Sequence, residues 1–445
     1  MEGHRLGLPD GWAIVPLAEI CSAITDGTHK TPNYVASGIR FISIANIKPF
    51  KPIDWDAYVR YITSKEHILL CNRVKPQYDD ILFPRVGTLG YAKRIDFRDD
   101  ISIFVGLGLA RPIKEIVMPQ FLEYFLNTME VDLFSRKNAK GTGRMTLPLE
   151  ASRVMPVKLP PLAEQRRIVA KVDALFSKLY KGVETLQTIR QQLRTYRQAV
   201  LKWAFEGKDW EKKPMKSISQ VLGGGAFKSG DFLSNGKYQV IKIGNVRPGI
   251  IRLQEKPAFV NSVEGYEKYQ LQDGDVVITL TGTRKKRDYG FTAIINHTNL
   301  LLNQRVAAIR FQDNYLPKFF MYYSWTRAFQ DSFFADETGN VGQGNVGMKA
   351  ITDTLVPYCS LDEQHTIVVA IESRLSVCDK LEQIVDENLA KATVLRQSIL
   401  KKAFSGQLVP QDPNDEPAEK LLERIKQEKR STNYANNTNK KRRKA

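Results

Sequence analysis

Two long stretches of the chain carry an apolar residue at every third or fourth position. In residues 162–206 these positions are Ile168, Val172, Leu175, Leu179, Val183, Leu186, Ile189, Leu193, Tyr196, Val200 and Trp203. In residues 361–405 they are Ile367, Ile371, Leu375, Cys378, Leu381, Val385, Asn388, Ala392, Leu395, Ile399 and Ala403. This spacing places one side-chain stripe on one face of an α-helix. The sequence therefore predicts two long amphipathic helices.

Residues that disfavour a helix mark the ends of both stretches. Pro160 and Pro161 precede the first, and Gly207 and Gly406 follow the two stretches, where glycine favours a left-handed C-terminal cap. An isolated helix with one apolar stripe is marginally stable, so we expect the two helices to pack on each other as an antiparallel pair within the chain. Asn388 either fixes the register of this pair from a buried position or lies at its surface.

A sequence repeat connects the two helical stretches. LAEQRRIVAKVDALFSKL from Leu162 matches LDEQHTIVVAIESRLSVC from Leu361, and RQAVLKWAFEG from Arg197 matches RQSILKKAFSG from Arg396 at the same offset. No residue is inserted or deleted between these matches. The two helices therefore keep a constant length, as a spacer would.

The repeat extends upstream of each helix, but with a varying offset. FISIANIKP, which ends at Pro49, matches VIKIGNVRP, which ends at Pro248. DDILFPRVGT, ending at Thr88, resembles GDVVITLTGT, ending at Thr283. The upstream parts accept insertions, so the chain is a tandem duplication of a variable globular domain and a helix of constant length.

Short β-like runs alternate with helical runs in both globular parts, which predicts an α/β (mixed α+β) fold. We expect two similar globular domains separated by two long antiparallel coiled-coil helices, related by a pseudo-twofold axis. The predicted segments are a first globular domain (1–158), a first helix (159–208), a second globular domain (209–357), a second helix (358–408) and a C-terminal extension with a basic tail (409–445).

Charge and composition narrow the function of this duplicated chain. Its 445 residues include 66 Lys and Arg against 48 Asp and Glu, a formal charge of +18, which favours a polyanionic partner, most simply nucleic acid. No run of 18 apolar residues is present, which argues against a transmembrane helix and a membrane partner. The four cysteines, Cys21, Cys71, Cys359 and Cys378, form no CxxC pair, so we expect reduced thiols in a cytoplasmic protein.

The sequence offers little chemistry for catalysis. GGGAFKS from Gly223 lacks the glycine that precedes the lysine of a phosphate-binding loop, and no DPPY-like methyltransferase segment is present. The five histidines have no metal-like spacing. Asp79 and Asp80 could in principle serve a nuclease, but solvated turn carboxylates are the better interpretation. We therefore expect no catalytic residue, no metal site and no cofactor in this chain.

Basic and polar loops lie at equivalent places in the two globular domains. The candidate DNA-binding residues are Arg85, Thr88, Lys93, Arg94, Lys140 and Arg144 in the first domain, and Thr283, Arg284, Lys285, Lys286, Arg287, Gln343, Asn345 and Lys349 in the second. Arginine and lysine suit phosphate contacts, and Arg, Gln and Asn suit base edges. The alternative for any one loop is a solvated charged surface.

Several motifs resemble one protein family. LPDGW at Leu8, LPPLAEQRRIVAKVD at Leu159, SLDEQHTIV at Ser360 and the matching helix ends are similar to motifs of the DNA-sequence-specificity subunit of type I restriction-modification enzymes. The resemblance covers nearly the whole chain. The second copy departs from it at its start, where Trp210 is present but the Gly-Trp pair is not.

The resemblance implies partners and a mechanism that spacing alone does not. Each globular domain would be a target-recognition domain that reads one half of a bipartite double-stranded DNA site. Two modification (methyltransferase) subunits, which bind S-adenosylmethionine and methylate adenine, would dock on the helices, and restriction subunits using ATP and magnesium would complete the complex. The chain itself would be non-catalytic. From the residues alone, a coiled-coil scaffold that binds RNA or an acidic protein stays the alternative.

Overall fold

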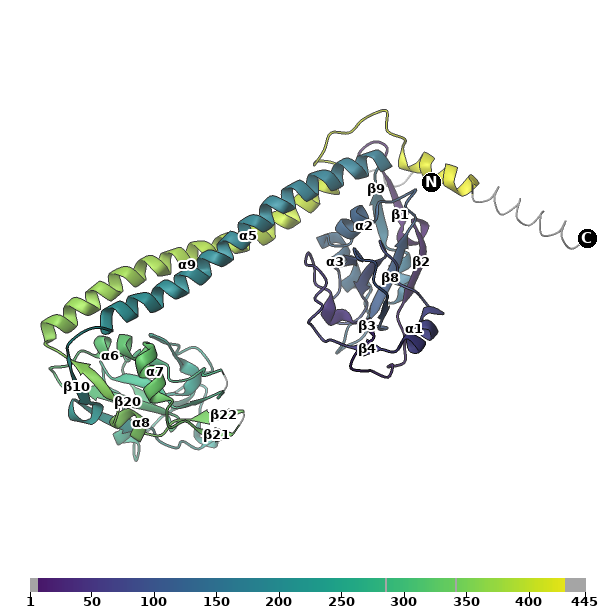
Figure 1. The fold of residues 1–445 in the computed structure, drawn as a ribbon. Coiled ribbons are helices and arrows are strands. Elements are labelled where there is room, and N and C mark those ends of the chain that lie inside the picture. Colours follow the sequence, from purple (N-terminus) through teal and green to yellow (C-terminus); the bar gives the residue numbers. More distant parts are fainter. Residues whose placement is uncertain (1–6, 285, 341, 429–445) are drawn as a thin grey trace, which may run out of the picture. The chain divides into compact units, whose positions relative to one another are not determined.

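The computed structural model describes residues 7–284, 286–340 and 342–428 (Figure 1). Its contacts divide the chain into two compact units. The first unit contains the chain up to Thr185 and again from Asn388 onward, and the second is Leu186–Glu387. Each unit therefore holds one globular head and one segment of each long helix. The predicted basic tail after residue 428 and the candidate Lys285 lie outside the described residues.

The two long helices predicted from the apolar stripes are present as α5 (Leu162–Phe205) and α9 (Leu361–Ala403). Gly207 and Gly406 follow them with φ angles of 69° and 72°, the left-handed conformation expected of a glycine cap. Sequence and structure agree here because a long helix depends mainly on local spacing and on the residues that stop it.

The helices run antiparallel in both units. In the second unit Arg190 of α5 forms an ion pair with Asp386 of α9, and Arg197 forms one with Asp379. An advance of seven residues along α5 therefore corresponds to a retreat of seven residues along α9. In the first unit, the Arg396 guanidinium of α9 lies 5.3 Å from the centre of the Tyr180 ring of α5. The predicted antiparallel pair within the chain is confirmed.

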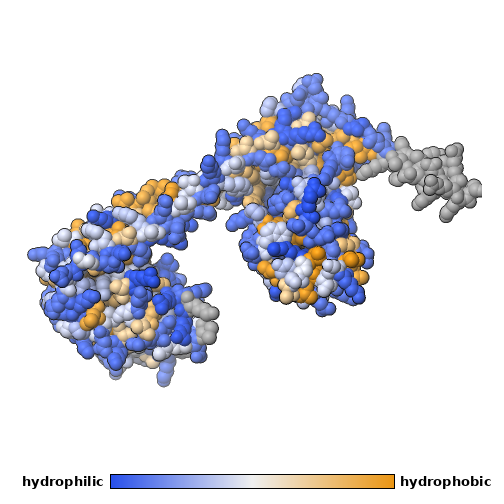
Figure 2. All heavy atoms as spheres, viewed as in Figure 1, coloured by the Kyte–Doolittle hydropathy of each residue, from blue (hydrophilic) through white to orange (hydrophobic). Residues whose placement is uncertain are grey.

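The predicted stripes are buried only in part. Val172 and Val200 of α5 and Ile371 and Val385 of α9 are buried, as expected. Other predicted members are exposed, namely Tyr196, Trp203, Leu381 and Leu395, and Figure 2 shows apolar side chains at the helix surface. When two helices pair only with each other, each buries a narrower face than a helix packed against a globular core. Asn388 is exposed, which is the surface alternative for that residue.

Within the described residues, the first head combines three sheets and four short α-helices. The strands are β1 (Ala13–Pro16), β2 (Cys21–Asp26), β3 (Ile39–Ile42), β4 (Tyr61–Ile62), β5 (Ile81–Pro84), β6 (Lys93–Arg94), β7 (Ile101–Ile103), β8 (Leu107–Pro112) and β9 (Pro156–Leu159). An antiparallel sheet has the order β2-β8-β5-β6, and a second has the order β4-β3-β7 with β3 and β7 parallel. β1 pairs with β9 directly before α5. The helices are α1 (Ser64–Cys71), α2 (Pro119–Phe125), α3 (Met129–Asn138) and α4 (Leu149–Arg153).

The second head repeats this topology. Its four-stranded sheet has the order β11 (Ser219–Gly223), β20 (Val306–Phe311), β16 (Val276–Thr279) and β18 (Thr292–Ile294). One of its three-stranded sheets has the order β15 (Phe259–Val260), β12 (Tyr238–Ile241) and β19 (Leu300–Leu302). β10 (Glu211–Pro214) pairs with β23 (Leu355–Tyr358), and β13 (Val246–Arg247) with β14 (Ile250–Ile251). The helices are α6 (Pro317–Ser324), α7 (Arg327–Phe333) and α8 (Lys349–Thr352). The predicted mixed fold and tandem duplication are confirmed.

One buried ion pair corrects a prediction from the sequence. Asp80 is not a solvated turn carboxylate: its side chain is 2% exposed and accepts hydrogen bonds from Arg111 at 2.7 and 2.8 Å. Asp275 and Arg310 form the same pair in the second head, at 2.8 Å. The strand that supplies each arginine comes some thirty residues later, so the pairing is invisible in the local sequence pattern.

A buried glutamine ties each head to the first turn of its helix. Gln165 accepts a hydrogen bond from Met118 N at 2.9 Å and donates to the carbonyls of Ile116 and Pro160 at 3.0 and 3.1 Å. Gln364 makes the same pattern with the head of the second unit. Both side chains are fully buried, and their bonds to the carbonyls of Ile116, Pro160 and Cys359 are buried as well.

The C-terminal extension completes the core of the first unit. Residues 418–428 are helical, and Leu421 and Leu422 are buried in the same apolar cluster as Trp12 and Val172. Arg167 of α5 pairs with Asp415 at 2.6 Å. The segment after α9 is therefore part of the first unit's fold.

Replacing Gln165 with leucine should destabilise the first unit. The change leaves two buried carbonyl groups and the partly buried Met118 amide without their partner, so we expect the free energy of unfolding to fall by about 2–4 kcal/mol. Urea denaturation followed by circular dichroism measures this. Gln187→Leu, at an exposed position of α5, is the matched control, and equal losses in the two variants would contradict the role of Gln165.

Candidate nucleic-acid interface

A polar hairpin projects from the main sheet of the second head. β17 (Thr281–Gly282) follows β16 after one residue and pairs with β22 (Gln343–Asn345), which in turn pairs with β21 (Thr338–Asn340). Thr281 lies opposite Asn345 in this register. Gly339 has a φ of 115°, which suits glycine, and a Cβ there would meet Gln343 O at 2.2 Å. The hairpin can therefore close tightly and present polar side chains outward.

A tight turn after β17 carries the predicted basic cluster. Thr283 donates to Asp288 from its backbone amide at 2.6 Å and from its hydroxyl at 3.1 Å, and these bonds lower the pKa of the Asp288 carboxyl. Arg284 reaches the hairpin, where it donates to Gly339 O at 3.1 Å. Lys286 is exposed. The Arg287 guanidinium lies 4.8 Å from the centre of the Phe334 ring.

The structure brings some of the second head's candidate residues together and separates others. Thr283, Arg284, Gln343 and Asn345 belong to the turn and the hairpin, which are joined by strand pairing and the Arg284 bond. Lys349 lies at the start of α8, beyond the hairpin, and is exposed. The contact surface suggested by the sequence is thus centred on the hairpin.

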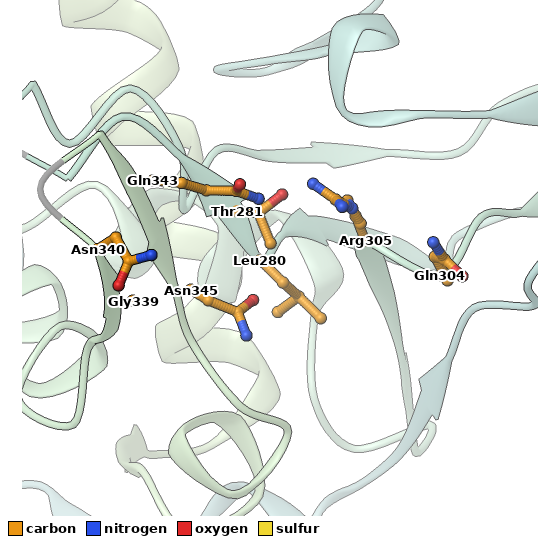
Figure 3. Close-up of a pocket in the computed structure, with 8 residues that line it drawn as sticks. All are labelled: Leu280, Thr281, Gln304, Arg305, Gly339, Asn340, Gln343 and Asn345. Atoms are coloured by element: carbon orange, nitrogen blue, oxygen red, sulfur yellow. The ribbon is translucent and has the colours of Figure 1, made fainter.

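A hollow of about 480 Å³ opens beside the hairpin (Figure 3). Its lining residues are Leu280, Thr281, Gln304, Arg305, Gly339, Asn340, Gln343 and Asn345. Gln343 and Asn345 were predicted as DNA contacts, whereas Thr281, Gln304, Arg305 and Asn340 were not. Gln304 and Arg305 directly precede the largely buried strand β20. A pair of polar residues before an apolar strand is the sequence feature that could have identified them as candidates.

The first head has a smaller version of the same hairpin. Val86 and Lys140 each form a β-bridge with Thr146, and the Gly87 amide donates to Met145 O at 2.9 Å. Thr88, Lys140 and Arg144 are exposed around this feature. The structure therefore groups these three candidates.

The other three candidates of the first head are engaged in internal ion pairs. Arg85 pairs with Asp26, whose side chain is 2% exposed, and donates to Leu147 O at 3.2 Å. Lys93 and Arg94 form β6, and their side-chain nitrogens lie 3.5 and 3.6 Å from the carboxylate oxygens of Glu123. Burial raises the pKa of Glu123, and the two cations oppose that rise. These side chains pair with carboxylates inside the head. Arg85 does so directly beside the hairpin, because it precedes Val86 and donates to the carbonyl of Leu147, the residue after Thr146.

The described residues hold no group of three or more His, Cys, Asp or Glu side chains suited to a metal ion. None of their helices is long and apolar enough to cross a membrane. All four cysteines are free thiols, as expected.

A family model for the type I restriction modification DNA specificity domain matches residues 9–193 and 207–389. The chain belongs to this family. Each matched range covers one head and most of the long helix that follows it, so the resemblance inferred from the helix motifs is confirmed. Its heads are DNA recognition domains of a type I specificity subunit.

Curated relatives match the chain over most of its length. The type I restriction enzyme EcoKI specificity subunit of Escherichia coli K12 is 25% identical over 460 residues, covering 95% of this chain and 96% of the relative. The MjaVIII specificity subunit of Methanocaldococcus jannaschii is 24% identical over 448 residues, covering 92% and 95%.

Two solved structures share the fold. A chain from a study of complex assembly and conformational transition of the type I R-M system has a TM-score of 0.68 at 20% identity, covering 90% of this chain and 99% of that one. The HsdS subunit from Thermoanaerobacter tengcongensis has a TM-score of 0.51 at 20% identity, covering 92% and 100%. The duplicated architecture is therefore that of specificity subunits.

Arg85 and Arg144 should respond differently to removal. Arg85→Ala leaves the buried Asp26 carboxylate with one fewer cation, so we expect the free energy of unfolding to fall by about 2 kcal/mol. Arg144→Ala changes an exposed residue, and unfolding should shift by less than about 0.5 kcal/mol while DNA affinity falls. Denaturation and duplex-binding titrations of both variants measure the contrast, which equal stability losses would contradict.

Proposed function

We propose that this chain is the DNA-reading subunit of a type I restriction-modification complex, in which each head binds one half of a bipartite duplex site. The observation that carries the proposal is the repetition of one hairpin scaffold in both heads with different side chains on it. A common scaffold supports binding to the same kind of ligand, and different side chains support different half-site sequences.

In this proposal α5 and α9 set the spacing between half-sites and dock two modification subunits. Exposed apolar side chains on α9, among them Val369, Val377 and Leu381, support a protein-binding role for the helices. The modification subunits bind S-adenosylmethionine and methylate adenine. Restriction subunits, with ATP and magnesium, cleave unmodified DNA. This chain supplies recognition and no catalytic group.

Sequencing of methylated adenines in cells with and without the gene tests the proposal. We expect a split motif with a gap of constant length, methylated on both strands, that disappears when the gene is removed. Competition of unlabelled RNA and duplex DNA for the purified chain tests the scaffold alternative. An unchanged methylation pattern, or preferential displacement by RNA, would contradict the proposal.

Neutralising the turn after β17 should weaken binding without changing the sequence that is read. Replacing Arg284, Lys285, Lys286 and Arg287 with alanine removes phosphate-seeking charge, so affinity should fall for every duplex alike. The slope of log affinity against log salt should become shallower by about 0.9 for each phosphate that the variant no longer neutralises. Titrations at several salt concentrations measure this, and a clean switch of the preferred sequence would refute the phosphate assignment.

Lengthening α5 should change spacing and leave half-site sequences intact. Four residues inserted after Gly182 add ~6 Å of helix at ~1.5 Å per residue, so the methylated motif should acquire a different gap or be lost with assembly. Gly182→Ala is the matched control, because a Cβ there meets nothing within 4 Å and the helix length is unchanged. An altered half-site with an unchanged gap would count against the helices as spacers.

A further inference from the structure

One hydroxyl group in the second head is buried without a partner. Thr281 is 7% exposed, and its Oγ1 atom makes no hydrogen bond to any described residue. Thr281 lines the hollow beside the hairpin. Because burial of an unpaired hydroxyl costs free energy, a small movement of the Thr281 side chain that lets Oγ1 bond to a polar group in the hollow would be favourable.

An unpaired guanidinium lies in the same hollow. Arg305 is exposed directly before β20, and within the described ranges its side chain makes no hydrogen bond or ion pair. Its backbone is held in place, since Arg305 O accepts a hydrogen bond from Leu280 N at 3.0 Å. A rigid backbone with a free planar fork is suited to a ligand with two adjacent acceptors.

The remaining polar lining consists of carboxamides. Gln304 adjoins Arg305, and Asn340, Gln343 and Asn345 come from the hairpin (Figure 3). No carboxylate is among the lining residues. Neutral amides add little attraction for phosphate but can donate to and accept from base edges, whereas arginine pairs with the O6 and N7 acceptors of guanine.

We propose that this hollow is the base-reading site of the second head, where Arg305 reads a guanine and Thr281 Oγ1 bonds to the same base pair or its neighbour. The assignment rests on the proposed function, and it adds Arg305 and Thr281 to the residues that determine specificity. Phosphate contacts then belong to the turn that carries Arg284 and Lys286.

The first head has neither an arginine at the position equivalent to Arg305 nor a threonine at the position equivalent to Thr281. Arg85 N donates to Gly106 O at 2.8 Å, as Leu280 N does to Arg305 O, so Gly106 occupies the place of Arg305. Val86, which bridges to Thr146, occupies the place of Thr281, which pairs with Asn345. The first head therefore lacks both reading groups at these positions, and the two heads should read different bases.

Selection of binding sites from random duplex DNA by the full chain is the first step of the test. Competition with duplexes that carry single-base changes in the second half-site then measures discrimination at each position. For wild type we expect a preference for guanine at one position of about 5- to 150-fold. Arg305→Ala should abolish that preference and leave the first half-site unchanged. Thr281→Val, which keeps the shape of the side chain, should reduce discrimination at the same or the adjacent position.

Two further variants make the outcome decisive. Arg305→Gln exchanges the guanine-reading fork for a carboxamide, so preference at that position should move toward adenine. Arg327→Ala removes one equal charge from the surface of α7, where the side chain is 90% exposed, and should leave all preferences unchanged. Thermal melting confirms that each variant is folded.

The possible failures are distinguishable. If wild type selects no split site, the proposed function fails. If wild type selects a split site but Arg305→Ala and Arg305→Gln keep the same preference, or lose affinity equally for all sequences, only the base-reading assignment fails.

Discussion

The structure depends on the burial of two apolar stripes that neither long helix can bury alone. A helix with a single apolar face gains most of its stability from a partner, and α5 finds that partner in α9 of the same chain. The antiparallel arrangement gives each unit one segment of both helices. Each unit is consequently built from residues far apart in the sequence.

The heads keep a common framework and vary at one edge. The Asp80–Arg111 and Asp275–Arg310 ion pairs, and the buried glutamines Gln165 and Gln364, occupy matching places in the two copies. A buried polar group that loses its partner costs more than an exposed one, so such networks tolerate little change. The hairpins and turns are solvated, so their side chains can differ without loss of the fold, and that freedom suits surfaces that recognise different sequences.

Local sequence patterns predicted the regular elements better than the chemical role of single cations. The α5 and α9 boundaries followed from spacing, prolines and glycines, and the grouping of Lys140 with Arg144, or of Gln343 with Asn345, followed from comparison of the repeats. The ion pair of Arg85 could not be predicted from local sequence, because its partner Asp26 lies in a strand that is distant in sequence. The burial of Asp80 is hidden for the same reason, since its partner Arg111 lies in a later strand. The sequence does not distinguish Arg305, because a lone arginine before a strand resembles many solvated residues.

The sequence by itself determined the duplication, the two amphipathic helices, the mixed fold and the excess of positive charge, because each is expressed by the order of neighbouring residues. Only the tertiary structure decided which charged groups are neutralised inside a head and which face solvent. Arg85 and Arg305 look equally free in the sequence. Strand pairing brings the buried Asp26 carboxylate to Arg85, whereas Arg305 shares a hollow with the unpaired Thr281 hydroxyl. Charges interact through space, over distances that the order of residues in the chain does not encode.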